Sequence, residues 1–274
     1  MEVNGKTRII GIFGNPIEHT LSPQMHNSAF KSLKLDMCYI PFRVSPDSLP
    51  EAVSAIRGLN MVGVNITVPH KENAIPLLDE VSEEAKFIGA INTVVNSDGK
   101  LTGYNTDGRG FMSALSEENI SVGGRKVFII GAGGASRAIS YYLSDKALKL
   151  SLFDVDKPKA EKLITDLNKI RDNVFLNDSA DDIGKFDIVI NATPLGLKPA
   201  DPLPLNPDLL HKEIVVCDLV YKKTDLLREA EKKGCKTIDG SGMLLWQGVL
   251  AFELWTGIRP PVDVMREALL SRIK

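Results

Sequence analysis

Cysteine and histidine are scarce in this sequence, with three cysteines and four histidines among 274 residues. Cys38, Cys217 and Cys235 lie far apart in the chain, each in apolar surroundings. An odd and scattered set of cysteines argues against a disulfide framework and matches no metal-ligand spacing. No two histidines have the i, i+4 spacing of a helical metal-binding pair. We therefore expect free thiols in a reducing cytoplasm and no metal site.

A strong net charge and a long apolar run are also missing. The formal net charge is -2, which gives no electrostatic footprint for nucleic acid or an anionic membrane. No apolar run approaches the roughly 20 residues that span a bilayer. Residues 1–6 lack the basic-then-apolar pattern of a signal peptide. These absences predict a cytoplasmic protein that binds neither nucleic acid nor membrane.

Strand-like and helix-like segments alternate along the first half of the chain, as is typical of α/β architecture. The strands expected there are residues 8–13, 37–42, 62–68, 90–96 and 101–104. The helices expected there are residues 23–33, 47–57, 71–78 and 106–118. Asp98-Gly99 separates the last two strands and is a strong hairpin dipeptide.

The pattern restarts after the turn at residues 122–124 with an uninterrupted apolar strand at 126–130, of the kind that is buried on both faces. Further strands are expected at residues 150–154, 186–192, 214–219 and 235–238, with helices between them. Two helices, 243–256 and 261–273, end the chain without another strand. We therefore expect two α/β lobes with a boundary near residues 106–124.

A glycine pair, Gly131 and Gly133, stands directly between the apolar strand and a helix. Glycines at this place let the backbone turn tightly and approach a pyrophosphate at the helix N-terminus. Ser136 occupies the position of the third glycine of this fingerprint, so an ordinary strand–helix turn is the alternative interpretation. Asp154 ends the next expected strand, 23 residues after Gly131, close to the separation of about 20 found in dinucleotide-binding lobes. The combination favours dinucleotide binding.

The residue at the end of this second strand also concerns the choice of dinucleotide. The Asp154 carboxylate would accept hydrogen bonds from ribose hydroxyls but repel a 2′-phosphate, and no arginine follows it. This favours NAD. Lys157 and Lys159 would favour a phosphate instead, unless they only form a solvated helix face.

Polar residues interrupt the apolar pattern of the first half at three places, namely residues 19–23, residues 65–71, and residues 89–93 together with 105–108 after the hairpin. Thr20 and Ser22 precede Pro23, which suggests a helix N-cap and also two hydroxyls that would receive a substrate carboxylate. Asn65 and Thr67 share one face of a strand, and Lys71 follows its carboxyl end, where open α/β sheets place ligands. As the first-turn residue of a helix, this lysine would oppose the helix dipole.

Eight motifs together resemble the shikimate dehydrogenase family over nearly the whole chain. In order they are GNPIEHTLSP (14–23), NITVPHK (65–71), GAINTV (89–94), YNTDG (104–108), GAGGASRA (131–138), NATPLG (191–196), DLVY (218–221) and DGSGMLLWQG (239–248). The resemblance implies two α/β lobes, with a cleft between them for hydride transfer and the final helices packed back on the first. Residues 1–107 plus 244–274 would form the substrate-binding catalytic domain, and 108–243 the NAD(P)-binding Rossmann domain.

The resemblance also assigns roles to individual residues. Lys71 and Asp107 would be the catalytic acid/base pair, and which of them holds the proton stays open. The residues implied to contact the substrate are Thr20, Ser22, Thr67, Lys71, Asn92, Asp107, Tyr221 and Gln247. The residues implied to hold the cofactor are Gly131, Ala132, Gly133, Gly134, Ala135, Asp154, Thr193, Leu219, Gly240 and Met243.

Two departures from the family pattern bear on specificity. Thr20 stands where the family usually has serine, and Asp154-Val155-Asp156 replaces the common NADP-binding Asn-Arg-Thr. Both resemble the quinate/shikimate dehydrogenase branch, which often uses NAD. We expect reversible, NAD(P)-dependent reduction of 3-dehydroshikimate to shikimate in chorismate biosynthesis, by a monomer or homodimer. The alternatives are an NAD-dependent quinate dehydrogenase, a folate-type or amino-acid dehydrogenase, and a non-catalytic nucleotide-sensing protein.

Overall fold

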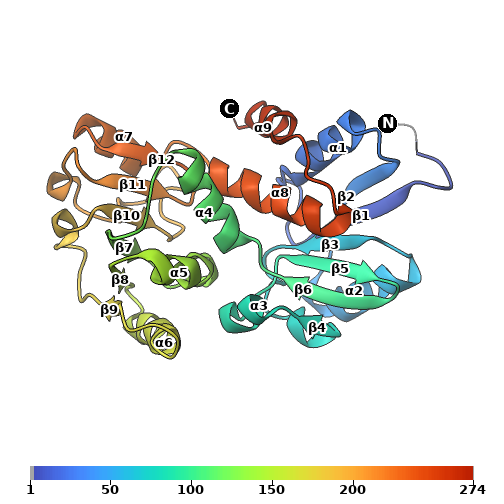
Figure 1. The fold of residues 1–274 in the computed structure, drawn as a ribbon, viewed down its shortest axis with the longest axis horizontal. Coiled ribbons are helices and arrows are strands. Elements are labelled where there is room, and N and C mark those ends of the chain that lie inside the picture. The colour runs from blue at the N-terminus through green and yellow to red at the C-terminus, as the bar shows by residue number, and fades with distance from the viewer. Residues whose placement is uncertain (1–2, 274) are drawn as a thin grey trace. The chain divides into compact units, whose positions relative to one another are not determined.

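The computed structural model describes residues 3–273, and the chain divides into two compact units (Figure 1). The first unit comprises Met1–Thr106 and Leu245–Lys274, and the second comprises Asp107–Leu244. These bounds differ by one residue on each side from the domain boundaries expected from the sequence.

A mixed sheet with the order β2-β1-β3-β5-β6-β4 forms the centre of the first unit. Its strands are β1 (Arg8–Gly14), β2 (Met37–Arg43), β3 (Gly63–Ile66), β4 (Glu80–Val81), β5 (Thr93–Ser97) and β6 (Lys100–Tyr104). β1 pairs with β2 and β3 in parallel, whereas β5 pairs antiparallel with both β3 and β6. The expected hairpin between β5 and β6 is confirmed, with positive φ angles of 53° at Asp98 and 90° at Gly99.

Helices of the first unit cover this sheet. They are α1 (Ser22–Ser32), α2 (Leu49–Gly58), α3 (Glu83–Ile88), the part of α8 (Ser241–Thr256) from Leu245 onward and α9 (Val262–Leu270), with short 3₁₀ turns at Pro46–Ser48 and Ile75–Leu77. α9 packs against α1 (Figure 1), so the expected return of the final helices to the first lobe is confirmed. Phe30 of α1 and Phe252 of α8 are fully buried, with ring centroids 5.1 Å apart.

The second unit has an all-parallel sheet with the order β12-β11-β10-β7-β8-β9. Its strands are β7 (Lys126–Ile130), β8 (Lys149–Phe153), β9 (Val174–Leu176), β10 (Ile188–Asn191), β11 (Val215–Asp218) and β12 (Lys236–Ile238). Its helices are α4 (Asp107–Glu117), α5 (Gly134–Lys146), α6 (Lys157–Leu167) and α7 (Asp225–Lys232), with 3₁₀ turns at Ile183–Lys185 and Pro207–Leu209. This is the strand order of the Rossmann fold, whose direction of winding reverses between β7 and β10.

The central strands of the second unit are buried on both faces, as their continuous apolar runs predict. Phe128, Val189 and Val216 are 0% exposed and belong to one apolar cluster, to which Leu226 of α7 also contributes. This packing fixes the carboxyl ends of β7 and β10 beside each other, with Ile130 opposite Asn191.

One predicted helix is wrong, and one short helix, α3, and two short strands were not predicted. Residues 71–78 form turns and the 3₁₀ segment Ile75–Leu77, because Pro76 lacks the N–H that an α-helix would need and its ring clashes with the preceding turn. β4 and β9 are too short to give a periodic pattern. No helix within residues 3–273 is long and apolar enough to cross a membrane, and all three cysteines are free.

Candidate active site

The polar segments of the first unit leave its sheet at one edge. β1 and β3 end together there, and β5 begins and β6 ends at the same edge because both ladders of β5 are antiparallel. The segments concerned are 15–22, 67–71, 90–92 and 105–106. Open α/β sheets bind ligands outside the carboxyl ends of their parallel strands, so the topology brings the predicted substrate residues of this unit to a suitable place.

Thr20 and Ser22 lie at the start of α1, where the Thr20 Oγ1 accepts the backbone N–H of Ser22 over 3.4 Å. The prediction that Ser22 is the N-cap is wrong, because Leu21 occupies that position and Ser22 is the first helical residue. Ser22 is 6% exposed, and its side chain is close enough to the Tyr39 phenol to oppose the rise in pKa that burial causes there. Its hydroxyl therefore belongs to a buried polar group of residues rather than to a helix cap.

Thr67 and Lys71 follow β3 in a series of turns, and both are half-buried. The backbone N–H of Thr67 donates to the carbonyl of Phe13 over 2.9 Å, and the carbonyl of Lys71 accepts the N–H of Ile91 over 2.9 Å. The argument that a helix dipole disfavours Lys71 is wrong, since no helix is present there. Its position just past the carboxyl end of β3 agrees with the expectation.

Asn92 is 3% exposed, and several hydrogen bonds fix its amide. Its Oδ1 accepts the N–H of Thr106 over 2.9 Å and the hydroxyl of Thr93 over 3.0 Å, while its Nδ2 donates to Thr106 Oγ1 over 2.9 Å. The main chain around it is fixed as well, because Ile66 donates to its carbonyl over 2.9 Å. Asn92 is thus held rigidly next to the segment that leads to Asp107.

The remaining substrate residues expected from the sequence lie on helices and a loop. Gln247 is on the part of α8 that belongs to the first unit and is half-buried. Asp107 is the first residue of α4, directly after Thr106, and Tyr221 follows β11 with 40% exposure; both belong to the second unit.

The glycine loop of the second unit lies where the winding of the sheet reverses. Gly131 follows β7 with φ of +105°, a conformation that side chains rarely adopt, and a Cβ there would stand 2.9 Å from the carbonyl oxygen of Ala192. Gly134 begins α5 and has open space beside it. Backbone N–H groups at the start of a helix attract phosphate. This loop therefore fits the pyrophosphate of a dinucleotide.

Asp154 and Lys159 flank this loop. The Asp154 carboxylate accepts the N–H of Ala132 over 2.6 Å and that of Asp156 over 2.9 Å, so it braces the loop. Nζ of Lys159 lies 4.0 Å from the place of a Cβ on Gly133, which puts a cation beside the loop. Lys157, by contrast, pairs with an aspartate on another segment, Asp178, over 2.8 Å.

A buried carboxylate that sequence reasoning missed stands at the carboxyl end of β11. Asp218 is 1% exposed and accepts hydrogen bonds from Asn191 Nδ2 (3.0 Å), the N–H of Val220 (3.0 Å) and the hydroxyl of Thr224 (2.7 Å). Burial raises the pKa of Asp218, and these donors oppose that effect. Polar residues that end buried strands, such as those opening NATPLG and DLVY, are the signal that could have found this group.

Asn191 connects this carboxylate to a predicted cofactor residue. Its Oδ1 accepts the N–H of Thr193 over 3.1 Å and the Thr193 hydroxyl over 2.6 Å. Its Nδ2 donates to the carbonyl of Leu195 over 3.1 Å as well as to Asp218. The loop after β10 is therefore shaped by a buried network, next to Gly131 at the reversal of the sheet.

Thiol chemistry and metal binding find little support at these sites. Burial raises the pKa of Cys217 to about 12, so this thiol is protonated at neutral pH. Within residues 3–273 no group of three or more histidine, cysteine, aspartate or glutamate side chains is placed to hold a metal ion. The available chemistry is that of hydroxyls, amides, the Lys71 amine and carboxylates.

Comparison with known proteins agrees with these features. Residues 12–94 match the shikimate dehydrogenase substrate binding domain, and residues 240–270 match the shikimate 5′-dehydrogenase C-terminal domain. A protein of Desulforamulus reducens named shikimate dehydrogenase (NADP(+)) is 47% identical, over 99% of this chain and 97% of its own length. The chain belongs to the shikimate dehydrogenase family.

Solved structures of this family have the same fold. A shikimate dehydrogenase in complex with NADP+ is 38% identical and superposes with a TM-score of 0.95, over 100% of this chain and 98% of its own. Shikimate 5-dehydrogenase from Listeria monocytogenes, in complex with shikimate and NAD, is 41% identical with a TM-score of 0.92, over 97% and 98%. Quinate dehydrogenase from Corynebacterium glutamicum, in complex with NAD, is 36% identical with a TM-score of 0.89, over 97% and 99%.

Proposed function

We propose that this member of the family is a shikimate dehydrogenase, which reversibly reduces 3-dehydroshikimate to shikimate with NADP(H) in chorismate biosynthesis. The observation that carries the proposal is the full-length similarity to enzymes of that name, on a chain that retains Lys71 and Asp107. Retention of both residues also disfavours a nucleotide sensor without activity. A folate-type or amino-acid dehydrogenase would leave the paired hydroxyls at residues 20 and 22 without a purpose.

In this proposal the first unit binds the substrate through neutral donors. The hydroxyls of Thr20 and Ser22 receive the carboxylate, and Thr67, Asn92 and Gln247 contact the ring hydroxyls. Rigid placement supports this role for Asn92, because its amide cannot turn without breaking several buried hydrogen bonds. Asp107 and Tyr221 complete the substrate contacts.

The proton of the reacting hydroxyl is assigned to Lys71 and Asp107. When the nicotinamide cofactor is bound, it accepts a hydride from the carbinol carbon or returns one to the ketone. Oxidation then releases the hydroxyl proton, which Lys71 takes up as general base while Asp107 orients the hydroxyl or shares the proton; reduction reverses these steps.

The second unit binds the cofactor in this proposal. The loop Gly131–Ala135 holds the pyrophosphate, Asp154 lies near the adenosine ribose, and Thr193, Leu219, Gly240 and Met243 line the nicotinamide half. Asp154 alone favours NAD, but both of its oxygens already accept backbone N–H groups. Lys159 supplies a cation for a phosphate beside this loop. Together with the names of the relatives, this supports NADP(H) as the preferred cofactor and NAD(H) as the weaker one.

Quinate oxidation is the second candidate, favoured by one residue. Thr20 stands at a position where the family usually has serine, and the quinate dehydrogenase structure is also similar over nearly the whole chain. The free thiols support a cytoplasmic location, and we propose a monomer or homodimer.

A four-way assay of the purified protein tests the proposal. Shikimate or quinate is supplied with NADP+ or NAD+, and the absorbance of the reduced nicotinamide is followed. The proposal predicts the highest kcat/KM for shikimate with NADP+. A clear preference for quinate with NAD+ would establish the second candidate instead, and no turnover in any of the four mixtures would contradict both.

A further inference from the structure

A continuous chain of buried polar side chains runs through the first unit. Tyr39 on β2 donates its phenolic proton to Asn65 Oδ1 over 2.6 Å, and Asn65 Nδ2 donates to the Asn92 carbonyl over 2.9 Å and to Thr93 Oγ1 over 3.1 Å. Thr93 in turn donates to the Asn92 amide. Its members, Tyr39, Asn65, Asn92 and Thr93, are between 0% and 4% exposed. The chain therefore leads from an edge strand to a proposed ring-hydroxyl contact.

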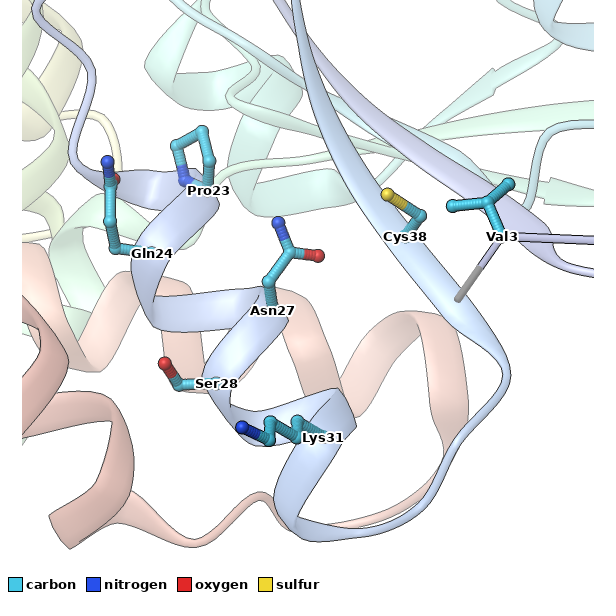
Figure 2. Close-up of a pocket in the computed structure, with 7 residues that line it drawn as sticks. All are labelled: Val3, Pro23, Gln24, Asn27, Ser28, Lys31 and Cys38. Carbon is cyan, nitrogen blue, oxygen red and sulfur yellow. The ribbon is translucent and has the colours of Figure 1, made fainter. Parts of the chain in front are cut away.

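Tyr39 is the member of this chain whose position is fixed most completely. The side chain of Asn27 accepts the Tyr39 N–H over 2.8 Å and donates to the Tyr39 carbonyl over 2.9 Å, although β2 is an edge strand. Figure 2 shows Asn27 projecting from α1 into the hollow beside the strand that carries Cys38. The ring of His26 stacks on the phenol with centroids 4.5 Å apart and an interplanar angle of 15°.

The phenol settles the orientation of the Asn65 amide. It has one proton, which goes to Asn65 over 2.6 Å. The same proton makes Oδ1 the accepting end of the Asn65 amide and leaves Nδ2 to donate toward Asn92 and Thr93. Burial keeps the phenol neutral by raising the pKa of Tyr39 far above its usual value. No charge is thereby placed near a site for an anionic substrate.

We propose that Tyr39 is a positioning residue for the substrate, acting through Asn65 without touching the substrate itself. This inference rests on the proposed function, because it takes Asn92 as a substrate contact. Removing the hydroxyl leaves Asn65 Oδ1 buried without its donor, so the amide that binds the Asn92 carbonyl and the Thr93 hydroxyl loses its fixed orientation. The consequence is weaker binding of the acid with little change in cofactor binding.

Tyr39→Phe tests this, since it keeps the stacked ring and removes only the hydroxyl. The KM for shikimate should rise about 10-fold, whereas kcat and the KM for NADP+ should stay within about two-fold. Trp255→Phe is the matched control. Trp255 packs against the same His26 ring, and its indole N–H donates to the Val94 carbonyl over 3.0 Å. The variant loses this one buried hydrogen bond, but Trp255 takes no part in the chain of polar side chains. It should lower Tm and leave the KM for shikimate unchanged.

A double variant separates positioning from general loosening. In an Asn65→Ala background, Tyr39→Phe should raise the KM for shikimate by less than in the wild type, because the route from Tyr39 to Asn92 is already gone. If Tyr39→Phe does not fold, Asn27→Ala is tested instead, because this variant removes the side chain that binds the Tyr39 backbone and keeps the phenol. A several-fold rise in the KM for shikimate is then expected.

The outcomes distinguish this inference from the function on which it rests. Wild-type turnover of shikimate is measured first, and its absence contradicts the proposed function and this inference together. An active wild type whose KM for shikimate is unchanged in Tyr39→Phe, with only Tm lowered as in the control, overturns the role of Tyr39 alone. Equal increases in the KM values for shikimate and NADP+ would also overturn it.

Discussion

The two units each contain a buried polar network beside their proposed ligand, but the networks differ in charge. The network of the first unit consists of neutral hydroxyls and amides from Tyr39 to Thr106. That of the second unit is built around a carboxylate, Asp218, whose donors come from Asn191, Val220 and Thr224. Burying a charge is costly unless hydrogen bonds satisfy it, and the second unit supplies those bonds.

The charge of the ligands agrees with the difference. The proposed substrate is a carboxylate, so a buried negative charge beside its contacts at Thr20 and Ser22 would oppose binding. The oxidised nicotinamide ring is positively charged, and a negative group in the unit that holds it does not oppose it. On this account the neutral network orients an anion, and the charged network shapes the cofactor loop. Changes in the neutral network should therefore alter substrate binding, and changes in the charged network should alter cofactor binding.

The largest expected effect belongs to the proton-transfer residue. Lys71→Ala should lower kcat by roughly 10²–10⁴, with little change in either KM, because general acid–base catalysis contributes about that much. Steady-state kinetics of shikimate oxidation measures this. Glu72→Gln is a control in the neighbouring exposed position and should leave kcat unchanged. A kcat for Lys71→Ala equal to that of the wild type would remove this residue from the chemistry.

The histidines of the two units should respond oppositely to pH. Burial lowers the pKa of His26 in the first unit to about 3, so below the unfolded value near 6.5 the unfolded chain binds a proton that the folded chain does not. The free energy of unfolding should fall by about 1.4 kcal/mol per pH unit as pH drops from about 6 toward 3, and be insensitive to this group above 7.

His26→Phe should remove this acid sensitivity, as measured by urea unfolding at pH 7 and pH 4.5. His211 of the second unit is the control, because the Gly184 carbonyl and Glu213 raise its pKa. The stability that His211 contributes to the folded state is present at low pH and is lost as pH rises through the raised pKa of His211. His211→Gln should therefore keep the acid sensitivity, and its disappearance in this variant would contradict the assignment to His26.

Removing the buried carboxylate of Asp218 should weaken the binding of the cofactor. Asp218→Ala leaves Asn191 and Thr224 without their shared acceptor, and the KM for NADP+ should rise about 10-fold while that for shikimate changes less than two-fold. Asp218→Asn is the matched control. It keeps the acceptor at Oδ1 and can donate to the Thr224 hydroxyl, so its effect should be smaller. An equal rise in the KM values for NADP+ and shikimate in Asp218→Ala would contradict the claim that this network serves the cofactor.

The smallest effect concerns the cation beside the glycine loop. Lys159→Ala should raise the KM for NADP+ by about three- to ten-fold and leave that for NAD+ nearly unchanged, because an exposed charge pair contributes about 1 kcal/mol. Lys157→Ala is the control, since Lys157 already pairs with Asp178. If both lysine variants raise the KM values for NADP+ and NAD+ to the same extent, Lys159 does not bind the additional phosphate of NADP+.

Local chemistry made much of the fold predictable. The Asp98-Gly99 hairpin and the Gly131 turn follow from residues that accept positive φ angles, and the strands of the second unit follow from continuous apolar runs. The helix expected at residues 71–78 failed because Pro76 outweighed the apolar spacing. β9 has three residues, Val174–Leu176, and is held by its neighbours in the sheet rather than by its own pattern.

The polar networks were less accessible from the sequence. Motifs named Ser22, Thr67, Lys71 and Asn92, but nothing local in the chain pairs Tyr39 with Asn65, which is 26 residues away. The same holds for Asn191 and Asp218, which are 27 residues apart. Such partners meet only because the sheet brings strands that are distant in sequence together. The sequence therefore identifies candidate contacts better than the residues that hold them in place.

The separation of the carboxylate contact from the glycine loop is tested most directly by one crossed measurement. Steady-state KM values for shikimate and NADP+ are determined in Ser22→Ala and in Gly131→Ala, where an added Cβ would meet the Ala192 carbonyl. The account predicts a crossed pattern: Ser22→Ala raises the KM for shikimate alone, and Gly131→Ala raises that for NADP+ alone. If each variant raises both values to a similar extent, these two places do not serve separate ligands, and the account is contradicted.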